Sequence, residues 1–109
     1  MLCVYWIKSG PKRYIGYTTN GAQHRLRQHN REISGGAGTT KLKPGQKPWV
    51  IKRVVTGFRG TIEAQRFERA LKFEFNKHER AGGKNEAQRM LALETTIAQP
   101  CWGGKLTYV

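Results

Sequence analysis

Acidic residues are scarce in this sequence: 7 Asp and Glu stand against 20 Lys and Arg, which gives a net charge of +13. Solubility does not require such an excess, and the mutual repulsion of the charges works against compaction. A polyanionic partner explains the excess, and nucleic acid explains it better than a membrane surface. Because the basic residues are spread along the chain, they predict a charged face on a folded domain rather than a disordered arm.

Cysteine and long apolar runs are also lacking. The two cysteines, Cys3 and Cys101, belong to no CxxC motif and to no Cys/His cluster with zinc-like spacing. Free thiols in a reducing compartment are the simplest interpretation. The apolar run Leu2–Ile7 is far too short to span a bilayer, and no signal peptide pattern is present. We therefore expect an intracellular protein of the nucleus or cytoplasm, with no membrane partner.

The 109 residues fit one compact domain, and no linker divides them, so we expect a single domain over residues 1–109. Segments rich in β-branched and aromatic residues predict strands over Leu2–Lys8, Arg13–Thr18 and Trp49–Thr56. Apolar residues at helical spacing predict helices over Asn20–Glu32, Ile62–Arg80 and Glu86–Ala98. The tail to Val109 is expected to add a short extended segment.

Capping residues mark the expected helix starts. Asn20 is followed by Gln23 as in a capping box, and Thr61 and Asn85 precede the two later helices. The last helix has an expected apolar stripe of Ala87, Met90, Leu91, Leu93 and Ile97.

The order of elements is β-β-α-β-α-α, and the short connection between the first two strands favours an antiparallel hairpin. Three strands alone bury little apolar surface, so helices must cover them. We expect an α/β (α+β) fold in which a small, three-stranded, mainly antiparallel sheet is flanked by helices.

Glu68 does not fit the apolar stripe on which it lies. Ala64, Leu71 and Phe75 recur at helical spacing, and Glu68 falls among them. Burying a carboxylate is costly unless a cation or hydrogen bonds compensate. Either one of the many arginines pairs with Glu68, or Glu68 is a ligand for Mg²⁺, which prefers hard oxygen ligands and often takes only one or two carboxylates.

The first helix carries a similar anomaly. Ala22, Leu26 and Ile33 make an apolar face, and His29 lies on that face. A histidine in such a place is often a satisfied core residue. Arg25, four residues earlier, can point at the same spot, and a guanidinium beside an imidazole suits a phosphate.

Tyr5 and Tyr14 lie on the first two strands, where core packing is the ordinary explanation for a tyrosine. Gly16 weakens a strand unless something must approach it closely. Aromatic residues beside a glycine and a basic helix suit a nucleic-acid backbone.

The Gly-rich segment Ser34–Lys47 matches neither GxxxxGK[ST] nor GxGxxG, so it is not a nucleotide cradle. Its lysines belong either to a solvated loop or to a mobile loop that contacts DNA.

Together these features resemble the GIY-YIG nucleases. The YIG element is Tyr14-Ile15-Gly16, and the GIY element is Cys3-Val4-Tyr5, which keeps the tyrosine but not the glycine. Arg25 and Glu68 match the arginine of the first helix and the glutamate of a later helix in that family. His29 matches a position where many members carry His or Tyr.

A narrower resemblance is to the nuclease domain of the Slx-type structure-specific endonuclease subunits. It rests on six motifs in one order: Tyr14-Ile15-Gly16-Tyr17-Thr18, Arg25-Leu26-Arg27-Gln28-His29-Asn30, Gly35-Gly36-Ala37 with Thr39 or Thr40, Pro48-Trp49, Gly57-Phe58 and Arg66-Phe67-Glu68. The motifs cover residues 2 to about 75. The C-terminal helix and tail, 84–109, lie outside them.

The resemblance implies a metal-dependent DNA endonuclease with a catalytic set of Tyr5, Tyr14, Arg25, His29 and Glu68. Glu68 would hold Mg²⁺, for which Mn²⁺ is expected to substitute, and Arg25 would stabilise charge on the phosphate. Tyr5 is the expected general base and His29 the proton relay, although these two roles could be exchanged. Tyr14 would orient the water or the phosphate.

The implied substrate is branched DNA, such as flaps and junctions in repair or recombination. Residues expected to contact its backbone are Arg27, Lys41, Lys43, Lys47 and Arg66. Slx-type subunits carry a C-terminal zinc domain that helps to bind a regulatory partner, and two cysteines cannot build that domain. This departure predicts a stand-alone nuclease of viral or bacterial type, a monomer or a weak homodimer, and leaves the regulatory partner open.

Two other functions are compatible with the residues. One is a site-specific nuclease on the same scaffold, although such enzymes add a recognition module for which this chain has little room. The other is a basic nucleic-acid-binding protein without activity, which would have no reason to place Arg25, His29 and Glu68 on apolar stripes.

Overall fold

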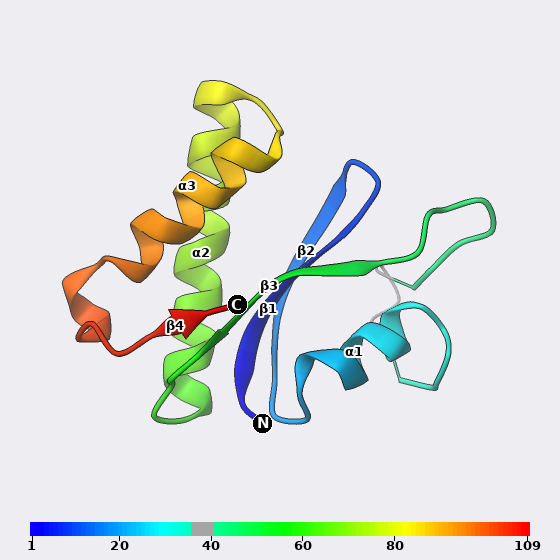
Figure 1. The fold of residues 1–109 in the computed structure, drawn as a ribbon, viewed down its shortest axis with the longest axis horizontal. Coiled ribbons are helices and arrows are strands. Elements are labelled where there is room, and N and C mark those ends of the chain that lie inside the picture. Colours follow the sequence, from blue (N-terminus) through cyan, green and yellow to red (C-terminus); the bar gives the residue numbers. More distant parts are fainter. Residues whose placement is uncertain (36–40) are drawn as a thin grey trace.

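The computed structural model describes residues 1–35 and 41–109. Its elements, in chain order, are β1 (Cys3–Ser9), β2 (Lys12–Thr18), α1 (Ala22–His29), β3 (Val50–Thr56), α2 (Thr61–Gly82), α3 (Glu86–Ile97), a 3₁₀ turn (Pro100–Trp102) and β4 (Thr107–Tyr108). The strands form one antiparallel sheet in the order β2-β1-β3-β4 (Figure 1). The predicted α+β class and the antiparallel hairpin are confirmed, and the extended segment expected in the tail is a fourth strand.

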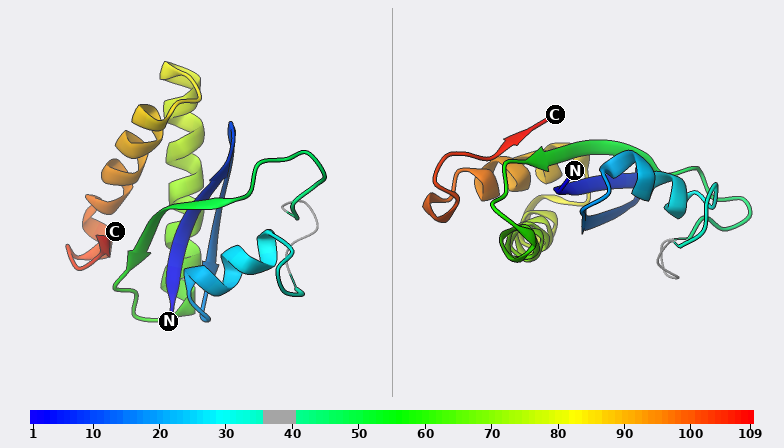
Figure 2. Two further views of the ribbon diagram at one scale, coloured as in Figure 1. Left: turned by 45° about the vertical axis from the view of Figure 1, so that its right-hand side comes forward. Right: turned by 90° about the horizontal axis from the view of Figure 1, so that it is seen from below.

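Helices cover both faces of this sheet: α2 and α3 lie on one side and α1 on the other (Figure 2). The central strand β1 is therefore buried on both faces, and its side chains alternate between two cores. Val4 and Trp6 pack with α2 and α3, whereas Cys3, Tyr5 and Ile7 pack with residues on the α1 side. This double burial explains why β1 has an almost continuous apolar sequence.

The long helix α2 uses the predicted stripe. Ala64, Phe67, Leu71 and Phe75 are all buried against the sheet or α3. The Phe75 ring meets the Trp6 ring edge-on, with centroids 5.1 Å apart. Because α2 packs against β2, a residue that follows a member of this stripe, such as Glu68 after Phe67, lies near the edge of the sheet.

The first helix is shorter than predicted and does not begin at Asn20. Its N-cap is Gly21, whose φ of 89° favours glycine, and the backbone N–H of Asn20 bonds to the Thr18 hydroxyl instead. The helix ends at His29 rather than Glu32. Arg31 adopts the left-handed conformation with φ 61°, and Glu32 N bonds to Arg27 O, so the end is a Schellman motif.

Two further predictions for the helices are wrong. Thr61 does not cap α2, because the N-cap is Gly60 and Thr61 is already helical. The α3 stripe is displaced: Ala87 and Leu91 are exposed, and Arg89 and Thr96 are buried beside Leu93. Asn85 does cap α3, since its side chain accepts a hydrogen bond from Gln88 N.

Candidate active site

The register of the β1–β2 hairpin brings the two candidate tyrosines onto one face. Tyr5 lies opposite Gly16 and Ile7 opposite Tyr14, so the two tyrosines are diagonal neighbours with ring centroids 6.2 Å apart. A Cβ on Gly16 would lie 2.6 Å from the Tyr5 hydroxyl oxygen and 2.9 Å from Cε2 of Tyr14. The glycine is needed here because both rings occupy the space that any other side chain would take.

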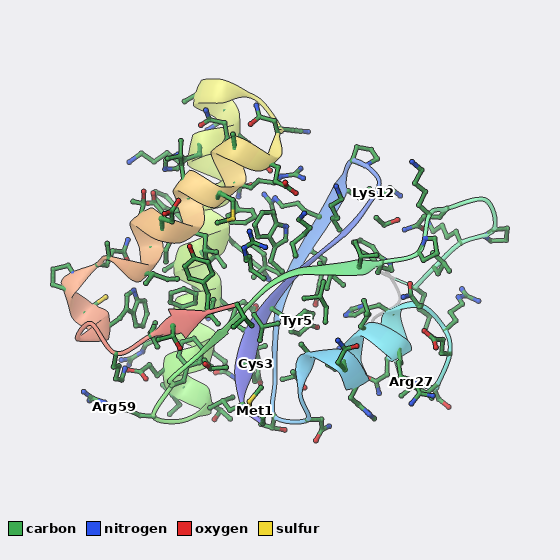
Figure 3. The ribbon with its side chains drawn as sticks, in the orientation of Figure 1. Met1, Cys3, Tyr5, Lys12, Arg27 and Arg59 are labelled. Atoms are coloured by element: carbon green, nitrogen blue, oxygen red, sulfur yellow. The ribbon has the colours of Figure 1, made fainter. Side chains whose placement is uncertain are left out.

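His29, at the last turn of α1, completes this aromatic group. The Tyr5 hydroxyl lies 3.0 Å from Nε2 of His29, and the Tyr14 ring centroid lies 5.0 Å from that of His29. His29 is fully buried, and Tyr5 lies in the middle of the molecule on the α1 side of the sheet (Figure 3). The apolar face predicted for the first helix therefore does carry this histidine into the interior.

The environment fixes the protonation state of this pair. Burial raises the pKa of Tyr5 to about 12, and the nearby Arg25 guanidinium acts against this rise. Burial, followed by the charge of Arg25, lowers the pKa of His29 to about 4. At neutral pH the phenol is protonated and the imidazole is neutral, and the Tyr5 hydroxyl donates to Nε2 of His29 when the ring proton is on Nδ1.

The Arg25 guanidinium interacts with the Tyr5 side chain and is held by Gln28. Its Nη1 donates to Oε1 of Gln28, and more weakly to the carbonyl oxygen of Gly35 at 3.4 Å. Its Nε is buried and has no hydrogen-bond partner among the described residues. A buried guanidinium N–H without an acceptor is costly, and a phosphate oxygen is a group that would satisfy it.

Glu68 reaches the same region from the other side of β2. It lines a hollow of about 570 Å³ with residues from β2, α1 and the start of α2, among them Tyr14, Gly16, Arg25 and Thr61. The negative charge of Glu68 adds a small contribution to the raised pKa of Tyr5, after burial and the charge of Tyr14. The structure thus places Tyr14, Arg25 and Glu68 around one hollow, and Tyr5 and His29 are buried next to Tyr14.

The Glu68 carboxylate is partly exposed, and one of its oxygens pairs with a lysine. Its Oε2 accepts from Nζ of Lys72 at 3.0 Å, and the side chain is 20% exposed. No group of three or more His, Cys, Asp or Glu side chains that could hold a metal occurs in residues 1–35 and 41–109. One carboxylate facing solvent fits Mg²⁺, whose other ligands are water and phosphate oxygens, and does not fit a zinc cluster.

The residues predicted to contact the DNA backbone do not converge on one patch. Arg27 is exposed on α1 beside Glu32, and Arg66 lines a separate hollow with Cys101 and Trp102. Lys41 lies after α1 near Gln28, and Lys43 lies at the far end of β2. Lys47 is exposed, and part of its predicted loop, residues 36–40, lies outside the described residues.

Sequence reasoning missed the polar residues that hold the candidate catalytic groups. Gln28 accepts from Arg25 and donates to the carbonyl oxygen of Ser34. Asn30 exchanges two hydrogen bonds with the backbone of Trp49, at 3.0 and 2.7 Å, and so joins the end of α1 to the start of β3. The i, i+3 spacing of Gln28 from Arg25 was a signal that could have found the first contact, whereas nothing local indicates the second.

Comparison with protein families matches residues 1–85 to the family described as GIY-YIG catalytic domain. Among curated proteins, similar chains are named structure-specific endonuclease subunit SLX1. The protein from Eremothecium gossypii is 35% identical over 90% of this chain and 36% of its own length. Those from Candida dubliniensis and Schizosaccharomyces pombe are 46% and 42% identical, over 62% and 61% of this chain and 24% and 25% of theirs.

The chain therefore spans about a third or less of the length of these relatives. The part matched by the family, residues 1–85, contains all five candidate catalytic residues. In the part of the chain that the structure describes, no helix has both the length and the apolar character needed to cross a membrane.

Proposed function

The chain belongs to the GIY-YIG catalytic-domain family, and on this premise we propose that it is a metal-dependent DNA endonuclease that nicks branched DNA, such as flaps and junctions. The observation that carries the proposal is the meeting of Tyr5, Tyr14, Arg25, His29 and Glu68 around one hollow and one aromatic cluster. The net charge of +13 supports a DNA substrate. The names of the SLX1 relatives support selectivity for branched structures.

In this proposal Glu68 holds the divalent cation, Mg²⁺ with Mn²⁺ as a substitute. When bound, the cation polarises the phosphate and stabilises the leaving 3′ oxygen. The solvent-facing position of Glu68 beside Tyr14 and Arg25 supports this role. Lys72, one turn later, donates to Oε2 of Glu68 at 3.0 Å.

Arg25 binds the scissile phosphate and stabilises the negative charge that grows on its oxygens during attack. The buried Nε supports this assignment, since this donor has no hydrogen-bond partner among residues 1–35 and 41–109. Gln28 is the positioning residue that holds the guanidinium plane from behind.

We assign His29 as the final proton acceptor and Tyr5 as the relay, with the His29 ring proton on Nδ1 and the Tyr5 hydroxyl donating to Nε2. A phenol with a pKa of about 12 is a poor source of phenolate at neutral pH, whereas the neutral imidazole has a lone pair on Nε2. The attacking water transfers a proton to the Tyr5 oxygen while the Tyr5 proton passes to Nε2. The resulting hydroxide attacks phosphorus, and Tyr14 helps to orient it.

The test is nicking of a labelled 5′ flap, a four-way junction and a linear duplex of the same sequence, with Mg²⁺ or with EDTA. The proposal expects cutting near the branch, in Mg²⁺ only, and little cutting of the linear duplex. Tyr5→Phe should lower the single-turnover rate by roughly a hundredfold or more, since it removes the relay. Tyr108→Phe, on the exposed strand β4, is the matched control and should cut at the wild-type rate.

Equal cutting of branched and linear DNA would reject the structure selectivity while leaving a nuclease. Binding without cutting in any metal would reject the catalytic proposal.

A further inference from the structure

A second hollow, of about 560 Å³, lies at the other end of β2 from the candidate active site. It forms where the turn between β1 and β2 meets the last turns of α2, the start of α3 and the segment before β3. Figure 3 labels Lys12 at this end and Met1 and Arg59 at the opposite end. We call it the hairpin-tip cleft; its charged lining residues are Lys12, Arg13, Lys43, Glu79, Lys84 and Arg89.

The floor of the hairpin-tip cleft is a fixed pair of guanidiniums. Arg13 donates from Nε and Nη2 to both carboxylate oxygens of Glu79 at 2.9 Å, and Arg89 donates from Nε to Oε2 at 2.7 Å. Arg89 also donates to the carbonyl oxygen of Pro11 and is buried. The Arg13 guanidinium, and after it that of Arg89, holds the pKa of the Glu79 carboxyl below its usual range.

This floor has more positive charge than its own anion can balance. Two guanidiniums share one carboxylate, and the other oxygen acceptors around Arg13 are neutral, including the Asn76 amide at 2.9 Å. Around the rim, Lys12, Lys43 and Lys84 have no ion-pair partner among the described residues. An excess of partly desolvated cations in a hollow concentrates an anionic ligand there.

The distance from the candidate active site suits a DNA backbone. Glu68 and Glu79 lie on the same helix, and at 1.5 Å per residue their separation along its axis is about 16 Å. Along one DNA strand, phosphates advance about 3.4 Å per base pair. A strand held at the candidate active site therefore has phosphates near the hairpin-tip cleft after about five base pairs.

We propose that the hairpin-tip cleft is a second phosphate-binding site, which grips a DNA arm about five base pairs from the bond that is cut. This inference rests on the proposed nuclease function and adds a second site that binds the substrate away from the cut. The protein would then contact the DNA backbone at two places along β2, and these contacts would align an arm with the candidate active site. Binding of this kind reads shape and charge and not base sequence.

An acidic protein segment is the other polyanion to consider, and the lining favours it less. Protein partners are usually anchored by apolar side chains that fill apolar pockets. The aromatic residue of the cleft, Trp49, is 4% exposed and packs against His29. A ligand at the cleft would meet mostly guanidinium, ammonium and amide groups, which suit phosphates.

The test compares two flap substrates that differ only in one arm, which ends about three base pairs from the branch in one and about twelve in the other. Lys12→Gln and Lys84→Gln each remove one rim charge without touching the Arg13–Glu79–Arg89 floor. Each should weaken binding of the long-armed flap roughly threefold to fivefold and lower its salt slope by about one. Binding of the short-armed flap should change less than twofold. Arg59→Gln is the control and removes one charge at the opposite end of the molecule. It should change binding of the long-armed and the short-armed flap by the same factor.

Protection of lysines from acylation, read by mass spectrometry on the wild-type protein, provides a measurement that needs no variant. The long-armed flap should protect Lys12 and Lys84, and the short-armed flap should not. Equal protection by both flaps, or loss of affinity for both in Lys12→Gln, would overturn the inference. Protection by a glutamate-rich peptide but not by either flap would also overturn it and indicate an acidic protein segment.

These outcomes are separable from failure of the proposed function. If the wild-type protein cuts or binds flaps but does not sense arm length, the nuclease proposal stands and the second site falls. If the wild-type protein binds neither flap, the DNA substrate itself is wrong and both fall.

Discussion

Tyr5 and His29 form a buried pair whose chemistry depends on exclusion of water. The hydroxyl and imidazole are 3.0 Å apart, and both groups are at most 1% exposed. Desolvation favours the uncharged form of each group, which raises the pKa of the phenol and lowers that of the imidazole. Both groups are therefore uncharged at neutral pH, and the phenol can pass its proton to the imidazole only as its oxygen gains one from the attacking water.

The lowered pKa of His29 predicts how stability changes with pH. The folded pKa is about 4 and the usual value is 6.5, so below pH 6.5 the unfolded chain binds a proton that the folded chain does not. Stability due to this group is complete above pH 6.5 and is lost as the pH falls towards 4. The loss is about 3 kcal/mol, measured by urea unfolding at a series of pH values.

His29→Gln removes this titration and should flatten the stability curve between pH 7 and pH 4 by about the same amount. It also assigns the His29 signal in NMR spectra. An imidazole signal of His29 that titrates near pH 6.5 in the folded protein would contradict the predicted burial.

Gly16 is the residue whose size most directly controls the two tyrosines. Gly16→Ala would place a Cβ 2.6 Å from the Tyr5 oxygen and 2.9 Å from the Tyr14 ring, so one or both rings must move. We expect a loss of about 1–3 kcal/mol in unfolding free energy. We also expect a roughly hundredfold loss of nicking, since small misplacements of catalytic groups are costly.

Gly60→Ala is the matched control for Gly16→Ala. Gly60 is extended, with φ −176°, and a Cβ there meets nothing within 4 Å. It should retain nicking near the wild-type rate. Equal activity of the two variants would show that the space around Gly16 is not needed.

At the scale of the elements, two asparagines that look alike in the sequence have different roles. Asn85 caps α3 through its side chain, which accepts from Gln88 N at 2.9 Å. Asn20 precedes α1 but contributes only its backbone N–H, to the Thr18 hydroxyl. The difference arises because Gly21, with positive φ, takes the cap position of α1.

Asn85→Ala should therefore lower the unfolding free energy by about 1 kcal/mol, because it leaves the backbone N–H of Gln88 without its acceptor. Asn20→Ala should change the unfolding free energy by less than about 0.5 kcal/mol, as for an ordinary surface site. Urea unfolding of both variants measures the difference. A larger cost for Asn20→Ala would mean that α1 is capped by Asn20 after all.

Apolar spacing predicted α2 well and α3 less well, and the reason lies in what each helix faces. α2 packs on the sheet and needs a continuous apolar stripe, which Ala64, Phe67 and Phe75 supply. α3 packs on α2, where the Glu79 carboxylate draws Arg89 inward and Leu91 turns to solvent. Periodicity alone cannot anticipate a buried arginine, because the carboxylate that compensates for its burial, that of Glu79, belongs to another helix.

At the scale of the whole molecule, positive charge follows the free edge of β2 in two places. One is Arg25 at the candidate active site, and the other is the hairpin-tip cleft. Individual residues of the first could be selected from the sequence because each is a polar side chain on an apolar stripe or part of a motif. The second was hidden because it depends on pairs such as Arg13 and Glu79, which are 66 residues apart.

The central claim is that Glu68 is the metal ligand of a nuclease. The most direct measurement is Mg²⁺-dependent nicking of a labelled 5′ flap by the wild-type protein, Glu68→Gln and Glu63→Gln, with flap binding measured in parallel. Glu63 is a matched control on the same helix, since its side chain is 18% exposed against 20% for Glu68 and it pairs with Lys105.

The account predicts that Glu68→Gln binds the flap within about twofold of wild type but does not cut it, as expected when one metal ligand is lost and the backbone contacts remain. Glu63→Gln should bind and cut as the wild-type protein does. Cutting by Glu68→Gln at a rate near that of the wild-type protein, or wild-type cutting in EDTA, would contradict it.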